Sequence, residues 1–244
     1  MADNDMWIIK AALDWTIGFL ERKGDENPRL SAEWLMSEAT GLSRIELYMN
    51  FERPLTLDER ATLRDFVARR GKGEPLQLIS GKVPFRYITV LVAPNVLIPR
   101  PETEVLVSEA FAELKLPRVA DHVAAGENGE EVVSPELPEL RVVDLCTGSG
   151  CIACSIASEY PAAHVVALDI APEALALAGK NVEVLGLGNR VEVLESDLLG
   201  ALDPGKKGTF DLIVSNPPYV PTKVCDSLPR EVSEWDPRLA LDGG

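Results

Sequence analysis

The sequence predicts an open, Rossmann-like parallel α/β sheet, preceded by a small all-α domain and a joining β-hairpin. Three observations support this prediction. Short apolar runs alternate with helical patterns from residue 140 to residue 215, which is typical of parallel sheets. A glycine-rich turn follows the first of these runs. Four helical patterns fill the first 73 residues, and three of them reach a glycine, a common helix stop.

The composition is that of an ordinary globular protein. The 244 residues, 46% of them hydrophobic and 26% charged, suffice for one large domain or two small ones. No apolar run reaches the ~18–20 residues of a membrane span, and the acidic N-terminus lacks a signal-peptide pattern. We therefore expect a cytoplasmic chain without membrane contact, and we expect it to be a monomer.

The net charge of −15 is unevenly distributed along the chain. Residues 1–117 carry a balance of −3 and residues 118–244 a balance of −12. An acidic second half argues against a nucleic-acid partner, whose phosphates require clustered lysine and arginine. It fits a basic protein partner, although solubility alone also accounts for most such charges.

The first domain is expected to cover residues 1–74 as a helical bundle. Its helical patterns run over residues 6–24, 31–41, 43–50 and 56–73, with Ser31 and Ser43 as expected N-caps.

A β-hairpin linker is expected over residues 75–100, because β-branched and aromatic residues appear there with turn residues at Ser80–Gly81 and Pro94–Asn95. A helix is then expected from Pro101 to about Leu116, with Glu102 and Glu104 favourable at its N-terminus. The polar, acidic residues 118–139 are expected to form a loose surface connection.

The sheet itself is expected within residues 101–244. Strands are expected at residues 140–145, 164–170, 190–196 and 210–215, with helices at 151–160 and 171–186. Cys151 and Cys154 fall in the first of these helices without a second Cys/His pair nearby, so we interpret them as buried apolar residues and expect no metal.

The glycine-rich turn DLCTGSGC is a candidate cofactor loop. Glycines allow a ligand to approach the backbone, although G-x-G alone also occurs in simple tight turns. Asp169, at the end of the next strand, is placed to accept hydrogen bonds from ribose hydroxyls, or alternatively to cap the following helix. Asp144 would repel a pyrophosphate and suits a cationic methionine group, which disfavours a dinucleotide oxidoreductase and favours S-adenosylmethionine.

Two further strand ends carry candidate site residues. After the third strand, Asp197 could accept from an adenine amino group and Leu198 could pack on the purine, while capping by Asp197 is the alternative. After the fourth strand comes SNPPYV, in which Pro217 and Pro218 restrict the backbone. Their rigidity aims the Asn216 side chain and the Pro217 carbonyl at one point, which suits an NH₂ group that is to be alkylated. Tyr219 offers a face for a planar group.

These motifs resemble those of a known family. NPPY after a strand, with DLCTGSG upstream, resembles the class I amino-methyltransferases. VLIPRPETE resembles the linker signature of the HemK-type release-factor glutamine methyltransferases, and LPREVSEWDPRLALDGG resembles the stretch that follows NPPY in that family. The resemblance covers nearly the whole chain except residues 118–139.

The resemblance implies methyl transfer from S-adenosylmethionine to the amide nitrogen (N5) of the glutamine in the Gly-Gly-Gln loop of class 1 peptide chain release factors. It also implies substrate recognition by residues 1–74 and cofactor binding within residues 101–244. By position, the implied cofactor residues are Asp144, Thr147, Gly148, Ser149, Gly150, Cys151, Asp169, Asp197, Leu198 and Asn216, with Arg100, Glu102 and Thr103 of the linker motif beside them. The implied catalytic and substrate-binding residues are Asn216, Pro217, Pro218 and Tyr219.

Two departures from the family pattern stand out. Cys146 occupies a position where the family often has glycine. The family's sheet also continues beyond the point that corresponds to Gly244. We therefore expect a C-terminally truncated form with an incomplete sheet, in which strand 210–215 lies at an apolar edge that favours aggregation.

Other functions share parts of this pattern. Ribosomal-protein glutamine methyltransferases use the same amide chemistry, and adenine-N6 DNA methyltransferases share NPPY, although the charge of −15 argues against DNA. A truncated chain that binds cofactor or partner without turnover is a third hypothesis, from a different functional class.

Overall fold

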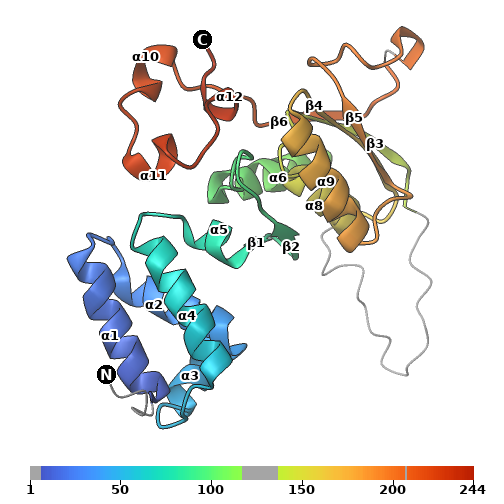
Figure 1. The fold of residues 1–244 in the computed structure, drawn as a ribbon. Helices are drawn as coiled ribbons and strands as arrows, with labels where there is room; N and C mark the ends of the chain where they lie inside the picture. The colour runs from blue at the N-terminus through green and yellow to red at the C-terminus, as the bar shows by residue number, and fades with distance from the viewer. Residues whose placement is uncertain (1–6, 117–136, 207) are drawn as a thin grey trace, which may run out of the picture. The chain divides into compact units, whose positions relative to one another are not determined.

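A computed structural model describes residues 7–116, 137–206 and 208–244 of the chain (Figure 1). The chain divides into two units, Met1–Gly81 and Lys82–Gly244. The first unit holds the helical bundle and the second holds the hairpin and the parallel sheet. Among the described residues, no helix is both long and apolar enough to cross a membrane.

The first unit contains all four predicted helices. They are α1 (Ile9–Arg22), α2 (Pro28–Thr40), α3 (Arg44–Met49) and α4 (Leu57–Arg70). Buried apolar residues from α1, α2 and α4 form one core, which includes Ile9, Leu35 and Leu63. A short fifth helix, α5 (Leu76–Ser80), lies where the sequence predicted the start of the hairpin linker, and Gly81 ends it in the left-handed conformation at φ 72°.

The two predicted N-caps had different outcomes. The Ser43 side chain accepts from the Glu46 amide and caps α3 as predicted. The prediction that Ser31 begins α2 is wrong, because the helix starts three residues earlier at Pro28. Proline fits the first turn of a helix, where its missing N–H has no partner to lose. Ser31 is instead buried within α2, where its hydroxyl donates to Asp25 at 2.8 Å.

The predicted hairpin opens the second unit. Strands β1 (Lys82–Phe85) and β2 (Ile88–Leu91) pair antiparallel, and the chain reverses at Arg86–Tyr87. Arg86 then forms a two-pronged ion pair with Glu159, at 2.5 and 2.6 Å, where the Glu159 side chain is only 2% exposed. This buried pair holds the turn of the hairpin against the helix that follows the first sheet strand.

The parallel sheet confirms the predicted fold. Its strands are β3 (Leu140–Leu145), β4 (Ala163–Asp169), β5 (Val191–Glu195) and β6 (Leu212–Ser215), in the order β5-β4-β3-β6. Helices α8 (Cys151–Glu159) and α9 (Pro172–Val184) lie along one face (Figure 1), and α6 (Pro101–Glu113) packs on α8. In the described part of the chain β6 pairs only with β3, and Ile213 is 55% exposed, so the predicted edge position of this strand is confirmed.

The last 25 residues add short helices that the sequence did not predict. They are α10 (Thr222–Cys225), α11 (Arg230–Ser233) and α12 (Arg238–Leu241), and a 3₁₀ turn at Pro204–Lys206 precedes β6. Most of the predicted surface connection at 118–139 lies outside the described residues. The four cysteines are free thiols, and Cys151 and Cys154 are buried as interpreted.

Candidate active site

The predicted site residues lie at or just after the carboxyl ends of the four parallel strands. Asp144 lies near the end of β3, Asp169 ends β4, Asp197 follows β5 and Asn216 follows β6. β4 and β5 lie on one side of β3, and β6 lies on the other. The strand order therefore reverses between β3 and β6, which is where open α/β sheets form a ligand crevice.

Asp144 is hydrogen-bonded to residues of the glycine-rich loop and of the helix that follows it. One carboxylate oxygen accepts from the Thr147 hydroxyl at 2.5 Å and from the Ala153 amide at 3.1 Å. The other oxygen, Oδ1, is buried without a hydrogen-bond partner among the described residues. Complete burial, together with the nearby charge of Asp169, raises the pKa of Asp144 to about 7. The loop therefore rests on a carboxyl group that is easily protonated.

Three loop residues adopt the left-handed conformation. They are Cys146 at φ 59°, Gly148 at φ 57° and Gly150 at φ 77°. A Cβ on Gly150 would lie 3.1 Å from the Ala178 Cβ, so glycine permits the close approach of α8 and α9. A Cβ on Gly148 would meet no heavy atom within 4 Å, so the backbone there is open to a ligand. The conformation of Cys146 explains physically why glycine suits that position.

Asp169 links the loop to the next strand. Its Oδ2 accepts from the Gly148 amide at 2.8 Å, and its Oδ1 accepts from the Ala171 amide at 3.0 Å. The capping alternative is wrong, because the N-cap of α9 is Ala171 and no side chain caps this helix, whereas Asp169 closes a short turn before it and borders the loop. Each carboxylate oxygen keeps a further lone pair for a ligand hydroxyl.

Two exposed apolar side chains lie at neighbouring strand ends. Leu198 is 59% exposed, with φ 51°, and Asp197 beside it is also exposed. Ile170, directly after Asp169, is 51% exposed and was not identified from the sequence. The sequence feature that could have identified it is an apolar residue directly after Asp169, the acidic residue that ends β4. Together Ile170 and Leu198 provide apolar surface for a planar ring.

Asn181 is a second residue near the site that was not predicted from the sequence. This buried residue of α9 donates to the Ser149 carbonyl at 2.9 Å and exchanges two hydrogen bonds with the Leu91 backbone, at 2.7 and 3.0 Å. It therefore ties the glycine-rich loop to the hairpin. A buried asparagine on an apolar helix face was the only available signal.

Asn216 brings the linker motif to the fourth strand end. Its Nδ2 donates to the Thr103 hydroxyl at 3.2 Å, and Thr103 is 6% exposed. A cavity of about 460 Å³ opens beside this contact, and residues of both motifs line it: Arg100, Glu102, Thr103, Asn216, Pro217 and Tyr219. Tyr219 is 76% exposed at the rim. The structure thus joins two motifs that are more than 100 residues apart.

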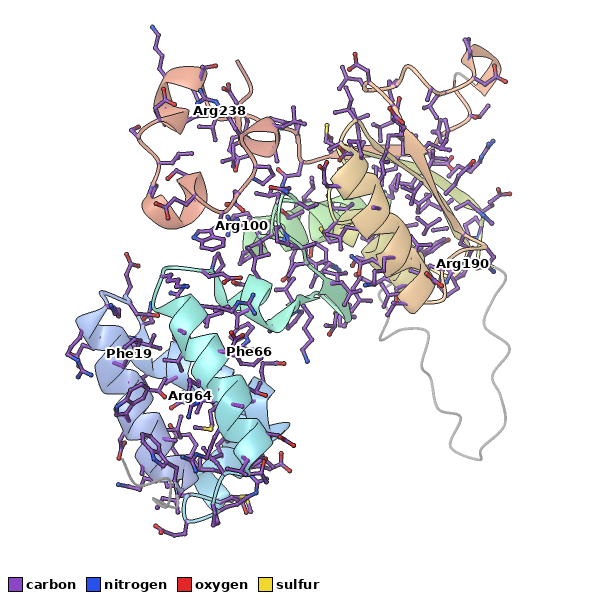
Figure 2. All side chains as sticks on the ribbon, viewed as in Figure 1. Phe19, Arg64, Phe66, Arg100, Arg190 and Arg238 are labelled. Atoms are coloured by element: carbon purple, nitrogen blue, oxygen red, sulfur yellow. The ribbon has the colours of Figure 1, made fainter. Side chains whose placement is uncertain are left out.

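The C-terminal segment holds the NPPY backbone in place. Val220 and Gly243 are hydrogen-bonded at 2.9 Å, and the Val220 amide donates to the Leu241 carbonyl at 2.9 Å. A Cβ on Gly243 would lie 2.7 Å from the Pro218 carbonyl oxygen, so only glycine fits against this loop. Arg100, which is labelled in Figure 2, adds an ion pair to the buried Asp236. The role of Gly243 was not predicted, because it depends on a contact distant in sequence.

Comparisons with known proteins agree with this geometry. Two family models match, the PrmC N-terminal domain over residues 11–81 and the methyltransferase small domain over residues 127–228. A release factor glutamine methyltransferase of Geobacter sulfurreducens is 46% identical over 240 residues, covering 98% of this chain and 75% of the relative. Relatives of the same name from Rhodopirellula baltica and Chlorobaculum tepidum are 42% and 38% identical, cover 100% and 99% of this chain, and are themselves covered to 76% and 77%.

Proposed function

The chain belongs to the family of release factor glutamine methyltransferases, and we propose that it methylates the glutamine N5 in the Gly-Gly-Gln loop of class 1 release factors. The observation that carries this proposal is the hydrogen bond between Thr103 and Asn216. It joins the linker motif and NPPY around one cavity beside the end of β6.

The loop residues fit S-adenosylmethionine, which supplies an electrophilic methyl group when bound. Gly148 leaves open space over the loop, and Asp169 keeps lone pairs for ribose hydroxyls. Leu198 and Ile170 offer apolar surface for adenine, with the exposed Asp197 carboxylate beside them. The buried Oδ1 of Asp144, which lacks a partner among the described residues, favours a donor or positive charge on the loop side.

Asn216 is proposed to orient the glutamine amide. Because its Nδ2 donates to Thr103, its carbonyl oxygen is left to accept from the substrate NH₂ group. The Pro217 carbonyl is the second proposed acceptor. Two acceptors that hold both N–H bonds turn the nitrogen lone pair toward the methyl donor and oppose its delocalisation into the amide carbonyl. Pro217 and Pro218 keep these acceptors rigid, and Tyr219 lines the entrance.

We propose further assignments that extend beyond the active site. Residues 1–74 recognise the protein substrate, residues 75–100 link the domains, and residues 101–244 bind S-adenosylmethionine. The chain acts as a cytoplasmic monomer without direct nucleic-acid contact, which the net charge of −15 supports.

The test is transfer of a labelled methyl group from S-adenosylmethionine to purified candidate substrates. We expect label on a class 1 release factor and none on ribosomal proteins or adenine-containing DNA. A release factor whose loop glutamine is replaced should remain unlabelled. Label on DNA or on a ribosomal protein alone would overturn the proposed substrate.

A further inference from the structure

The proposed reaction releases a proton, which Asn216 and the Pro217 carbonyl do not take up, because amide oxygens are weak bases. A glutamine side-chain amide carries two hydrogens on its nitrogen, and the methylated product carries one. The nitrogen therefore loses a proton as it gains the methyl group. A proton acceptor beside the nitrogen increases the rate of such a step, because it removes positive charge as that charge develops.

The cavity beside Asn216 contains one side chain that can accept this proton. Arg100, which lines it, is cationic and pairs with Asp236. Thr103 and Asn216 are hydrogen-bonded to each other, and hydroxyl and amide groups are weak proton acceptors. The rest of the described lining is apolar apart from a tyrosine hydroxyl, so Glu102 alone brings a carboxylate to this cavity.

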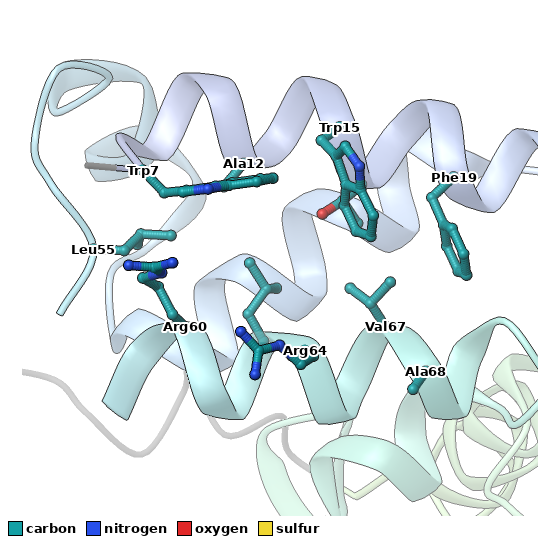
Figure 3. Close-up of a pocket in the computed structure, with 11 residues that line it drawn as sticks. Trp7, Ala12, Trp15, Phe19, Leu55, Arg60, Arg64, Val67 and Ala68 are labelled. Atoms are coloured by element: carbon teal, nitrogen blue, oxygen red, sulfur yellow. The ribbon is translucent and has the colours of Figure 1, made fainter. Parts of the chain in front are cut away.

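The cavity between α1 and α4, in the first unit, differs in this respect (Figure 3). It measures about 360 Å³, against about 460 Å³ for the cavity beside Asn216. Aromatic, aliphatic and arginine side chains line it, with Trp15, Arg60 and Arg64 among them. None of the described residues that line it is an aspartate or a glutamate. Of these two cavities, only the one beside Asn216 combines a carboxylate with a group that can orient an amide.

The position of Glu102 on α6 places it at this cavity. Glu102 is the second residue of the helix, and Leu106, four residues later, lines the same cavity. Residues four apart lie on one face of a helix, so this face of α6 borders the cavity. Thr103, which holds the Asn216 side chain, is the next residue in the chain. The linker motif therefore brings an orienting hydroxyl and a carboxylate to the same cavity.

The Glu102 side chain is free to react. It is exposed and forms no hydrogen bond or ion pair with the residues that the structure describes. Glu104, the other acidic residue in the first turn of α6, does not line this cavity. Both charges favour the helix N-terminus, whereas only Glu102 also lies at the cavity. Its exposure allows a proton to pass on to solvent.

We propose that Glu102 is the proton acceptor of the methyl transfer. As the bond from nitrogen to the methyl group forms, the bond from the methyl group to the donor sulfur breaks, and its electron pair stays on sulfur. One N–H bond of the glutamine amide breaks, and its electron pair stays on nitrogen. The proton passes to a Glu102 carboxylate oxygen, directly or through one water molecule, and then to solvent. The inference rests on the proposed function and adds a catalytic residue to it.

The test compares Glu102→Gln with the wild type in steady-state methylation of a class 1 release factor. The amide keeps the shape of the side chain and cannot take up the proton. We expect kcat to fall about 100-fold, with KM for the release factor and calorimetric affinity for S-adenosylmethionine unchanged. Glu109→Gln is the matched control, because it removes the same charge from an exposed position of α6 that does not line the cavity. It should keep the kcat of the wild type.

Chemical rescue separates proton transfer from a structural role. Glu102→Ala opens space beside the cavity, so added formate should restore part of its kcat, whereas chloride at the same ionic strength should not. Loss of a charge that only stabilises the helix N-terminus would not respond to formate. Formate without effect on Glu102→Ala would overturn the inference.

The same assays distinguish this inference from the proposed function. If the wild type methylates no release factor, the proposed function fails and the inference fails with it. If the wild type is active and Glu102→Gln has an equal kcat, only the inference is overturned. The same holds if Glu102→Gln binds S-adenosylmethionine more weakly and regains full kcat at saturating cofactor, because Glu102 would then hold the cofactor.

Discussion

The side chain of Asn216 donates a hydrogen bond to the hydroxyl of Thr103, 3.2 Å away and 113 positions earlier in the chain. This bond decides which end of the Asn216 amide faces the cavity. With Nδ2 engaged, the oxygen is left to accept, and an acceptor is what the NH₂ group of the proposed glutamine substrate requires. We propose on this basis that the linker motif orients the Asn216 side chain for the reaction.

Replacing Thr103 with valine should slow methyl transfer. The substitution keeps the shape of the buried side chain and removes the acceptor for Asn216 Nδ2. Loss of about 1 kcal/mol of orientation corresponds to a roughly fivefold lower kcat. Steady-state kinetics on the release factor measures this effect, and calorimetry should show unchanged affinity for S-adenosylmethionine. Thr103→Ser should restore the rate, and an unchanged kcat in Thr103→Val would contradict the orienting role.

Replacing Gly243 with alanine should disturb the NPPY backbone without unfolding the sheet. The new Cβ would lie 2.7 Å from the Pro218 carbonyl oxygen and 2.9 Å from the Tyr219 Cα, so the loop must move. Displacement of the substrate-holding groups by about 1 Å is expected to cost on the order of 100-fold in kcat/KM. Gly179→Ala in α9 is the control, because its Cβ meets nothing within 4 Å. Equal activity of the two variants would exclude the proposed positioning by the C-terminal segment.

Replacing Gly150 with alanine should destabilise the second unit. The residue adopts φ 77°, and the added Cβ would press on Ala178 at 3.1 Å. Left-handed strain and overpacking together are expected to cost about 2–4 kcal/mol in the free energy of unfolding. Urea denaturation measures this loss, with Gly188→Ala, whose Cβ site is open, as the control. If the two variants unfold at the same midpoint, the contact between Gly150 and Ala178 can accept an added methyl group without loss of stability, which would contradict the prediction.

Asp144 should make the folded protein less stable as pH rises from about 4 to about 7. Burial raises the pKa of Asp144 to about 7 in the folded state, whereas in the unfolded chain it is near 3.8. The folded state therefore binds more protons in this interval, and its stability falls as they are lost. Asp144→Asn removes this contribution, so its free energy of unfolding should depend less on pH over the same interval. Parallel curves for the two proteins would show that Asp144 is ionised throughout.

Periodicity was sufficient to predict the elements that depend on local pattern. The strands from β3 to β6 and their parallel direction follow from apolar runs that alternate with helical patterns. The edge position of β6 was expected for another reason, because the family that the sequence resembles continues its sheet beyond the point that corresponds to Gly244. The helices of the first unit were predicted for the same reason, whereas α5 was missed because five residues show too little periodicity. The chemical types at the strand ends, Asp169 and Asn216 among them, were also readable from the sequence.

Contacts distant in sequence could not be predicted in this way. Nothing local to Thr103 indicates that it accepts from Asn216, and nothing near Gly243 indicates that Pro218 lies 2.7 Å from its missing side chain. Asp144 shows the same limitation, because its raised pKa results from complete burial beneath the loop. The cavity between α1 and α4 likewise exists only after the helices have packed.

Methylation of the release factor glutamine is tested by tandem mass spectrometry of a class 1 release factor after incubation with this chain and S-adenosylmethionine. We expect a single added methyl group, located on the glutamine side chain of the Gly-Gly-Gln peptide. We also expect this methyl group to be nearly absent with Asn216→Ala. A methyl group on another residue, or an undiminished signal with Asn216→Ala, would contradict the proposed reaction.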